Sequence, residues 1–397
     1  MVVDFGLVEN GCEGHGVPGA ATFGETSAKA ALRFHRGIPG YEPTPLVSLD
    51  ALAAHLGVSE VWVKDEGARF GLNAFKGLGG SYAAARVIGE RLGIYPSELS
   101  FGLLTSPYVA EKVRDVTFVT ATDGNHGRGL AWTARMLGAG CVVYMPRGSA
   151  AERLMNIRAQ GAEAQILDLN YDDAVRFAAA QAERNGWILV QDTSWDGYEQ
   201  IPTWIMQGYT TMALEAAQQL GGKVPTHVFL QAGVGAMSGA ISGFLADYYG
   251  EQKPSICIVE PEAADCVYRT AAARDGELHA VGGDLPTMMA GLACGEPCGV
   301  GWEQLERHAD FFASVPDEVA ARGMRVLANP LPGDPAVVSG ESGAATLGFL
   351  ATVLSGESEV ADEAATRLGL GPDSRVLLIS TEGATDRRNF RRVLWGF

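Results

Sequence analysis

Short apolar runs alternate with longer amphipathic runs along most of the chain. The short runs are rich in branched apolar residues, and each is followed by roughly 10 to 20 residues with a helical pattern. Strands that alternate with helices of this length are typical of βαβ units with parallel strands. The pattern predicts strands at residues 61–63, 116–122, 141–145, 164–169, 187–191, 228–231, 256–260 and 376–381.

Helices are predicted in the runs between these strands. One follows Lys76, another begins at Glu341, and the rest cover residues 124–137, 150–159, 171–184, 201–220 and 240–249. Gly, Pro and Ser gather at 93–107 and 330–343, where we expect loops within the fold and not domain linkers. The predicted fold class is therefore α/β.

Composition and charge exclude several classes of partner. The chain has 397 residues, which is enough for two domains or one large α/β unit. Its formal net charge of −17 argues against nucleic acid and against an anionic membrane surface, because both need clustered Lys and Arg. No stretch reaches the ~18 apolar residues of a membrane span, and the first residues show no secretory signal. The 6 cysteines form no disulfide framework, so we expect a cytoplasmic protein with reduced thiols.

Lys76 stands between an apolar strand and a glycine-rich helix start, within residues 69–80. A lysine amine can form a Schiff base with an aldehyde cofactor, and its pKa falls readily when it loses water. A lysine in the first turn of a helix, without a chemical role, is the other interpretation of this position.

A second glycine-rich run, residues 231–239, follows a predicted strand and precedes a predicted helix. Its backbone N–H groups and the helix N-terminus suit a phosphate. A dinucleotide site is the competing interpretation, because Glu260 ends the next strand where a ribose-binding acid is expected.

Residues 121–127 also follow a strand and open a helix. The side chain of Asn125 and several backbone donors suit a carboxylate and a phenolic oxygen. Asp123 as a helix N-cap is the alternative, and we interpret His126 as a structural hydrogen-bonding residue. Thr381, after the last strand, has a hydroxyl that suits a pyridine nitrogen, although it is also placed to be an N-cap.

Together these motifs resemble the fold-type II (tryptophan-synthase-β-like) family of pyridoxal-phosphate enzymes, in the same order and over nearly the whole chain. More narrowly, residues 69–76, 121–129, 191–195, 201–209 and 289–296 resemble the diaminopropionate ammonia-lyases. The resemblance implies two doubly wound parallel-sheet domains with the active site in the cleft between them. It implies a large domain from 1–84 and 196–397, a small domain from 85–195, and a homodimer.

The resemblance also implies roles for the motif residues. Lys76 would form the Schiff base with pyridoxal 5'-phosphate, with Phe75 beside it. Asn125 would contact the phenolic oxygen of the cofactor and Thr381 its ring nitrogen. A neutral hydroxyl at that nitrogen favours β-elimination over transamination. The phosphate would be bound by Gly233, Val234, Gly235, Ala236 and Met237.

Two aspartates, Asp123 and Asp192, point to the substrate. Each follows a predicted strand, and a carboxylate there attracts a second ammonium group. Diaminopropionate has that group and serine does not, and a close charge pair contributes a few kcal/mol. We expect Lys76 to take the α-proton of the L-isomer and Asp123 that of the D-isomer, with pyruvate and two ammonia as products. The expected substrate-binding residues are Ala121, Thr122, Asp123, Gly124 and Asp192, although Asp192 as the cap of the following turn is an alternative.

Three other functions stay open at this point. A serine or threonine dehydratase has the same fold, a nicotinamide-dependent oxidoreductase would use the 233–239 loop and Glu260, and a non-catalytic binding protein would use only the scaffold. Residues 260–266 resemble the metal loop of dehydratases, but Cys266 stands where an acidic ligand is expected, so we predict no catalytic metal. We interpret Cys266 and Cys294 as two unrelated buried thiols.

Overall fold

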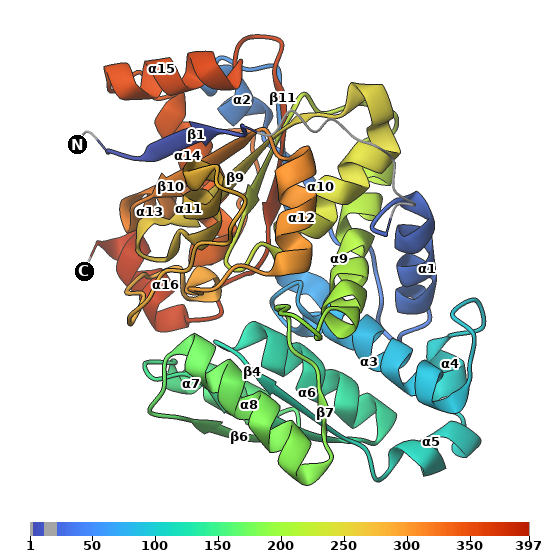
Figure 1. Ribbon diagram of the computed structural model, residues 1–397. Helices are drawn as coiled ribbons and strands as arrows, with labels where there is room; N and C mark the ends of the chain where they lie inside the picture. The colour runs from blue at the N-terminus through green and yellow to red at the C-terminus, as the bar shows by residue number, and fades with distance from the viewer. Residues whose placement is uncertain (1–2, 12–21, 397) are drawn as a thin grey trace.

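The computed structural model describes residues 3–11 and 22–396 and contains two β-sheets. Figure 1 shows the larger sheet with its helices on one side and the smaller sheet on the other, with α3 (Gly77–Leu92) and α9 (Gln200–Gln219) between them. No helix in the described ranges is both long and apolar enough to cross a membrane.

The larger sheet has seven strands, in the order β1-β10-β9-β8-β11-β3-β2. The five inner strands are parallel, and the two outer strands pair antiparallel with their neighbours. Helices on both faces bury the inner strands, which explains their continuous apolar sequences. The strands are β1 (Gly6–Glu9), β2 (Leu46–Ser48), β3 (Glu60–Asp65), β8 (His227–Gln231), β9 (Ser255–Pro261), β10 (Phe311–Val315) and β11 (Arg375–Ser380).

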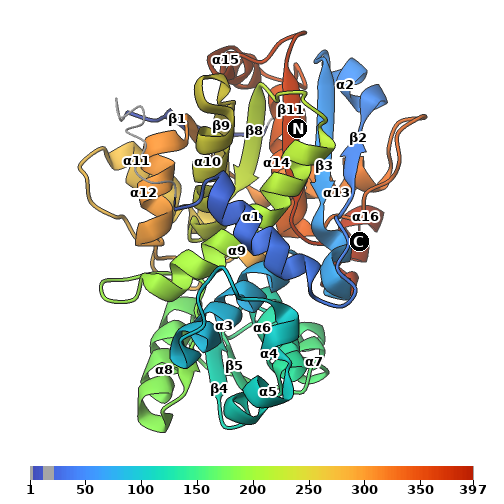
Figure 2. The same ribbon diagram turned by 90° about the vertical axis from the view of Figure 1, so that its right-hand side faces the viewer.

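Each face of this sheet has its own apolar core. One core includes residues of α1 (Glu25–Arg36), α9, α10 (Ala236–Tyr249) and α12 (Gly299–His308). The other includes residues of α2 (Asp50–Leu56), α13 (Asp317–Ala328), α14 (Glu341–Val353), α15 (Glu359–Leu368) and α16 (Arg387–Trp395). Figure 2 shows α1 and α9 in front of the sheet, with α13 and α14 behind it.

The smaller sheet has four parallel strands in the order β6-β5-β4-β7. They are β4 (Thr117–Ala121), β5 (Gly140–Met145), β6 (Glu163–Ile166) and β7 (Ile188–Leu189), and the helices around them are α6 (Asn125–Leu137), α7 (Ala151–Arg158) and α8 (Tyr171–Asn185). Two short helices, α4 (Phe101–Leu104) and α5 (Pro107–Val113), precede this sheet.

Every strand and helix that the sequence pattern predicts is present, and the α/β fold class is confirmed. The largest difference in bounds is at α10 (Ala236–Tyr249), which begins four residues before the predicted residue 240, and β6 and β7 end before the predicted residues 169 and 191. The pattern misses β1, β2 and β10. The first two are edge strands of 4 and 3 residues, too short to show a period.

Candidate active site

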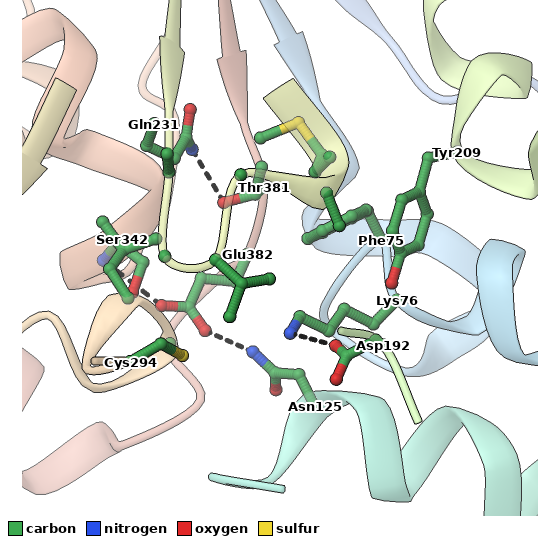
Figure 3. A pocket seen from close by; sticks show the side chains of 18 of the residues that line it. Phe75, Lys76, Asn125, Asp192, Tyr209, Gln231, Cys294, Ser342, Thr381 and Glu382 are labelled. Atoms are coloured by element: carbon green, nitrogen blue, oxygen red, sulfur yellow. Dashed lines mark hydrogen bonds and ion pairs between the residues drawn. The ribbon is translucent and has the colours of Figure 1, made fainter. Parts of the chain in front are cut away.

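A pocket opens between the two sheets at the carboxyl ends of β8 and β11, where open α/β sheets bind their ligands. It holds about 590 Å³ of atom-free space, part of it continuous with solvent. Figure 3 shows side chains from both sides of the cleft converging on it. Its lining includes Phe75, Lys76, Asn125, Tyr171, Asp192, Tyr209, Gln231, Gly233, Val234, Gly235, Ala236, Met237, Gly291, Leu292, Cys294, Ser342, Thr381 and Glu382.

The segment that carries Lys76 is fixed by a buried ionic network. Glu215 of α9 accepts hydrogen bonds at 2.7 Å from Lys64 Nζ and from a guanidinium nitrogen of Arg69. Arg69 also pairs with Glu66 at 2.8 Å. These charges lie out of contact with water, but each has an opposite partner, which is the condition for tolerating buried charge. The network ties the chain after β3 to α9, and Lys76 follows at the start of α3.

Lys76 and Asp192 form an ion pair inside the pocket. Lys76 Nζ lies 2.6 Å from Asp192 Oδ2 (Figure 3). Burial lowers the pKa of the Lys76 amine, but Asp192, Tyr209 and Asp123 together raise it by more, so the pKa is raised. Burial raises the pKa of Asp192, but the His126 ring and the Lys76 ammonium bring it down to about 2. Both groups are therefore charged at neutral pH.

The glycine-rich loop joins β8 to the N-terminus of α10. A Cβ on Gly233 would lie 3.2 Å from Leu292 Cα and 3.3 Å from Cys294 Sγ, so no larger residue fits without a shift. Gly235 has a φ of +88°, which favours glycine. With no side chains in the way, the backbone N–H groups at this helix start are open to an anion. The five predicted phosphate-binding residues, 233–237, all line the pocket.

Thr381 also lines the pocket, and Gln231 orients it. Gln231 Nε2 donates to Thr381 Oγ1 at 2.8 Å and to the carbonyl of Ile379 at 3.0 Å (Figure 3). Since Oγ1 accepts here, the hydroxyl hydrogen remains for a partner in the pocket. The sequence analysis gave Gln231 no side-chain role, although it ends the strand before the glycine loop.

Asn125 meets a carboxylate that the sequence analysis missed. Asn125 Nδ2 donates to Glu382 Oε2 at 2.6 Å, and Thr385 Oγ1 donates to the same oxygen at 3.0 Å. The backbone N–H of Ser342 donates to Glu382 Oε1 at 3.3 Å. Glu382 directly follows Thr381, so its position beside the last strand was the only signal available in the sequence.

Asp123 lines a neighbouring cleft, but its carboxylate is close enough to Lys76 and Asp192 for their charges to affect its pKa. That cleft holds about 1330 Å³ of atom-free space, and Tyr171 lines both cavities. Arg153 of α7, which the sequence analysis also missed, donates to Asp123 Oδ2 at 2.9 Å. Burial raises the pKa of Asp123, and Arg153 opposes this rise. The two predicted catalytic aspartates therefore have different partners and face different cavities.

The other expected substrate-binding residues, Ala121, Thr122 and Gly124, are not among the residues that line these two cavities. Ala121 and Thr122 are buried, and Thr122 Oγ1 accepts the backbone N–H groups of Gly124 at 2.9 Å and Gly127 at 3.3 Å. Gly124, not Asp123, is the N-cap of α6. The buried ring of His126 hydrogen bonds through Nε2 to the Val190 carbonyl at 2.7 Å, in agreement with a structural role.

Glu260 and the two thiols near it have local partners. Glu260 accepts backbone N–H groups of Val267 at 3.0 Å and Tyr268 at 2.5 Å, so its carboxylate caps α11 (Cys266–Ala273) and does not face a nucleotide. Cys266 and Cys294 are both free and both flank Gly233. Among the described residues, which exclude Cys12, no group of three His, Cys, Asp or Glu is placed to hold a metal ion.

Comparisons with known proteins agree on one family. A family model described as "Pyridoxal-phosphate dependent enzyme" matches residues 38–382. The diaminopropionate ammonia-lyase of Escherichia coli (strain K12) is 52% identical over 375 residues, which are 94% of this chain and 92% of that protein. Its crystal structure with an aminoacrylate–PLP azomethine reaction intermediate has a TM-score of 0.90 and 47% identity, covering 99% of this chain and 97% of that one. The structure with D-serine has a TM-score of 0.92 at the same identity and coverage.

Proposed function

Because the chain belongs to the family of pyridoxal-phosphate-dependent enzymes, and within it to the diaminopropionate ammonia-lyases, we propose that it converts 2,3-diaminopropionate to pyruvate and two ammonia. The observation that carries this proposal is the Lys76–Asp192 pair, at 2.6 Å, inside a pocket that also holds an anion-binding loop. The related protein from Escherichia coli has been solved with an aminoacrylate–PLP azomethine and with D-serine, which supports an elimination on a small amino acid.

The pocket fits pyridoxal 5'-phosphate. An amine, a glycine loop without side chains, and a hydroxyl with a hydrogen to donate line the same space. In this arrangement Lys76 would hold the aldehyde carbon of the cofactor, residues 233–237 would bind its phosphate, Asn125 would contact its phenolic oxygen and Thr381 its ring nitrogen. When bound, the cofactor supplies an aldehyde for the lysine and a ring that takes up electrons from the substrate.

Asp192 selects the substrate in this proposal. The Lys76 ammonium is its closest cation, and once committed to the cofactor Lys76 would no longer offer Asp192 a free ammonium group. The second ammonium group of diaminopropionate then takes its place beside Asp192. Serine and threonine have a hydroxyl at that position, which leaves the buried carboxylate unpaired. A lost partner of this kind costs about 2–5 kcal/mol, enough to favour a diamino acid over a hydroxy amino acid.

Two groups accept the α-proton, one for each isomer. Lys76, once free and neutral, takes it from the L-isomer, and Asp123 takes it from the D-isomer. The electron pair of the C–H bond becomes the new C=C bond, and the pair of the Cβ–N bond leaves with the amino group. Asp192 holds that group in its protonated form, so that it departs as ammonia. Water then hydrolyses the released aminoacrylate to pyruvate and the second ammonia.

The test is pyruvate release from the purified protein with added pyridoxal phosphate. D-diaminopropionate, L-diaminopropionate, L-serine and L-threonine are compared at equal concentrations. We expect rapid turnover of at least one diaminopropionate isomer and little from the hydroxy amino acids. Activity on serine or threonine alone would reject the proposed substrate and favour the dehydratase alternative, while leaving the fold and the role of Lys76 in place.

We also propose domain bounds, an oligomeric state and a cellular location. The small domain is assigned to residues 85–195 and the large domain to the remainder, which agrees with the strands of the small sheet between 117 and 189. Limited proteolysis should cut in the loops nearest to these bounds, at residues 93–98 and 195–197, and not within the buried helix α3. The homodimer that the family resemblance implies would be tested by light scattering, and the five described free cysteines suit a cytoplasmic protein.

A further inference from the structure

Arg153 is a buried cation that no step above uses. It lies near the start of α7, its side chain is 5% exposed, and its guanidinium lies 2.9 Å from Asp123 Oδ2. Burial lowers its pKa, but the carboxylates of Asp123, Glu382, Glu341 and Asp386 raise it by more. It is therefore permanently charged and surrounded by acids.

The absence of a side chain at Gly124 leaves room for the Arg153 side chain. Gly124 has a φ of +151°, and a Cβ on it would lie 3.0 Å from Arg153 Cδ and 3.2 Å from Arg153 Cβ. The apolar stem of the arginine consequently packs directly against the glycine that follows Asp123. A side chain at position 124 would displace the stem and strain the backbone. The Arg153 side chain is therefore fixed in two ways, by its ion pair with Asp123 and by the packing of its stem against Gly124.

The second guanidinium nitrogen extends this contact to the cofactor side. Arg153 Nη2 donates to Thr385 Oγ1 at 3.2 Å, and Thr385 Oγ1 donates to Glu382 Oε2 at 3.0 Å. Asn125 Nδ2 donates to the same Glu382 oxygen at 2.6 Å. Both ends of the 123–125 turn, in the small-sheet part of the molecule, are thus connected to the segment after β11 in the larger sheet.

We propose that Arg153 is a positioning residue that aims Asp123 at one face of the substrate and so sets the ratio of D- to L-isomer turnover. This inference rests on the proposed function. The arginine contact occupies Oδ2 of Asp123, and in the described part of the chain Oδ1 carries no hydrogen bond. Oδ1 is then free to accept the α-hydrogen of the D-isomer as a proton. Lys76 serves the L-isomer and has no contact with Arg153, so the arginine affects the two isomers unequally.

The test compares Arg153→Gln and Arg153→Lys with the unchanged protein, using both diaminopropionate isomers. A misplaced catalytic group can cost about 10²-fold. We expect Arg153→Gln to lower kcat/KM for the D-isomer by roughly 30- to 100-fold and for the L-isomer by less than threefold. Arg153→Lys keeps the charge and should restore part of the D-activity. The control is Arg147→Gln, because Arg147 lines the same cleft but is 58% exposed and pairs with Asp168; it should leave the ratio unchanged.

A second readout does not depend on turnover. Unfolding midpoints of the cofactor-free protein are measured for Arg153→Gln, Asp123→Asn and the double variant. Arg153→Gln leaves a buried carboxylate without its partner, so the double variant should be more stable than Arg153→Gln alone. A double variant that is less stable than Arg153→Gln alone would contradict the proposed dependence of Asp123 on Arg153.

Two outcomes separate this inference from the proposed function. If the unchanged protein turns over neither isomer, the proposed function fails before Arg153 is tested. If it turns over both isomers and Arg153→Gln lowers both equally, the function stands and the positioning role is rejected. If Arg153→Gln does not fold, the ratio measured with Arg153→Lys decides.

Discussion

The site contains two buried aspartate–cation pairs that differ in almost every other respect. Lys76 and Asp192 lie 2.6 Å apart within the pocket, whereas Arg153 and Asp123 lie 2.9 Å apart beside it. The pKa of Asp192 falls to about 2, while burial raises the pKa of Asp123 in spite of Arg153. The same residue type thus has opposite pKa shifts on the two sides of one site.

The difference follows from the cations. A lysine can lose its proton and become a nucleophile, while an arginine stays charged at any working pH. The Lys76–Asp192 pair is therefore suited to chemistry that consumes the cation, after which the aspartate needs a new partner. The Arg153–Asp123 pair is suited to holding one carboxylate in a fixed place. The predictions below test this division of roles.

Replacing Lys76 by Ala should have the largest effect. It removes the only side chain in the described pocket lining that can form a Schiff base. We expect turnover of both isomers to fall by more than about 10³-fold and the visible absorbance of the bound cofactor to be lost. Absorbance spectra and pyruvate release check this. Retained turnover with unchanged absorbance would show that another residue holds the cofactor.

Replacing Asp123 by Asn should separate the isomers. Removing a general base costs about 10²–10⁴-fold, and we expect this loss for the D-isomer only. The L-isomer should keep activity within about threefold, because Lys76 and Asp192 are untouched. Steady-state kinetics with each pure isomer provide the measurement. Equal losses for both isomers would reject the assignment of one base to each face.

Replacing Asp192 by Asn should change the pH dependence of stability in the cofactor-free protein. Its folded-state pKa of about 2 lies below the ordinary value, so the stabilisation is present above about pH 4 and is lost as pH falls toward 2. A shift of about two units corresponds to about 2–3 kcal/mol.

The measurement is urea unfolding of the unchanged protein and of Asp192→Asn between pH 2 and 6. The difference in unfolding free energy should be nearly constant above pH 5 and should shrink below pH 4. A difference in unfolding free energy that does not vary with pH would mean that Lys76 and His126 do not lower the pKa of Asp192 in the folded protein.

The sequence was sufficient for the parts of this site that lie at strand ends. Lys76, the 233–237 loop and Thr381 each follow an apolar strand, and parallel strands bring their carboxyl ends together. The parallel order also explains why eight of the strands could be found from short apolar runs. The edge strands β1 and β2 could not, since 3 or 4 residues show no period.

Residues that act through a side-chain partner were not predictable in this way. Arg153 stands in α7, where it resembles the arginines of any exposed helix, and only the fold shows that it is 5% exposed. Glu382 and Gln231 sit next to predicted positions, but the partners that bring them into the site, Asn125 for Glu382 and Thr381 for Gln231, are more than 100 residues away in the sequence. Long-range pairing of this kind leaves no local pattern.

Replacing Gly124 by Ala should weaken the Arg153–Asp123 pair without removing a charge. The φ of +151° disfavours alanine, and the new Cβ would meet the arginine stem at 3.0 Å. We expect a loss of about 1–3 kcal/mol of unfolding free energy and a fall in the D- to L-isomer ratio. Urea unfolding and paired kinetics check both. The same substitution in α4, Gly102→Ala, has nothing within 4 Å of the new Cβ, so it should not lower the unfolding free energy and should leave the isomer ratio unchanged.

Replacing Thr381 by Val should have the smallest effect, because it removes one hydrogen bond and keeps the shape. Gln231 Nε2 keeps its bond to the Ile379 carbonyl at 3.0 Å, so the strand end should not move. A single hydrogen bond contributes about 0.5–1.5 kcal/mol, which predicts a two- to tenfold rise in the dissociation constant of pyridoxal phosphate. Thr381→Ser retains the hydroxyl and should bind as the unchanged protein does. Since neither aspartate pair contacts Thr381, the D- to L-isomer ratio should stay constant in both variants, and a changed ratio would show that the hydroxyl acts on the substrate rather than on the cofactor.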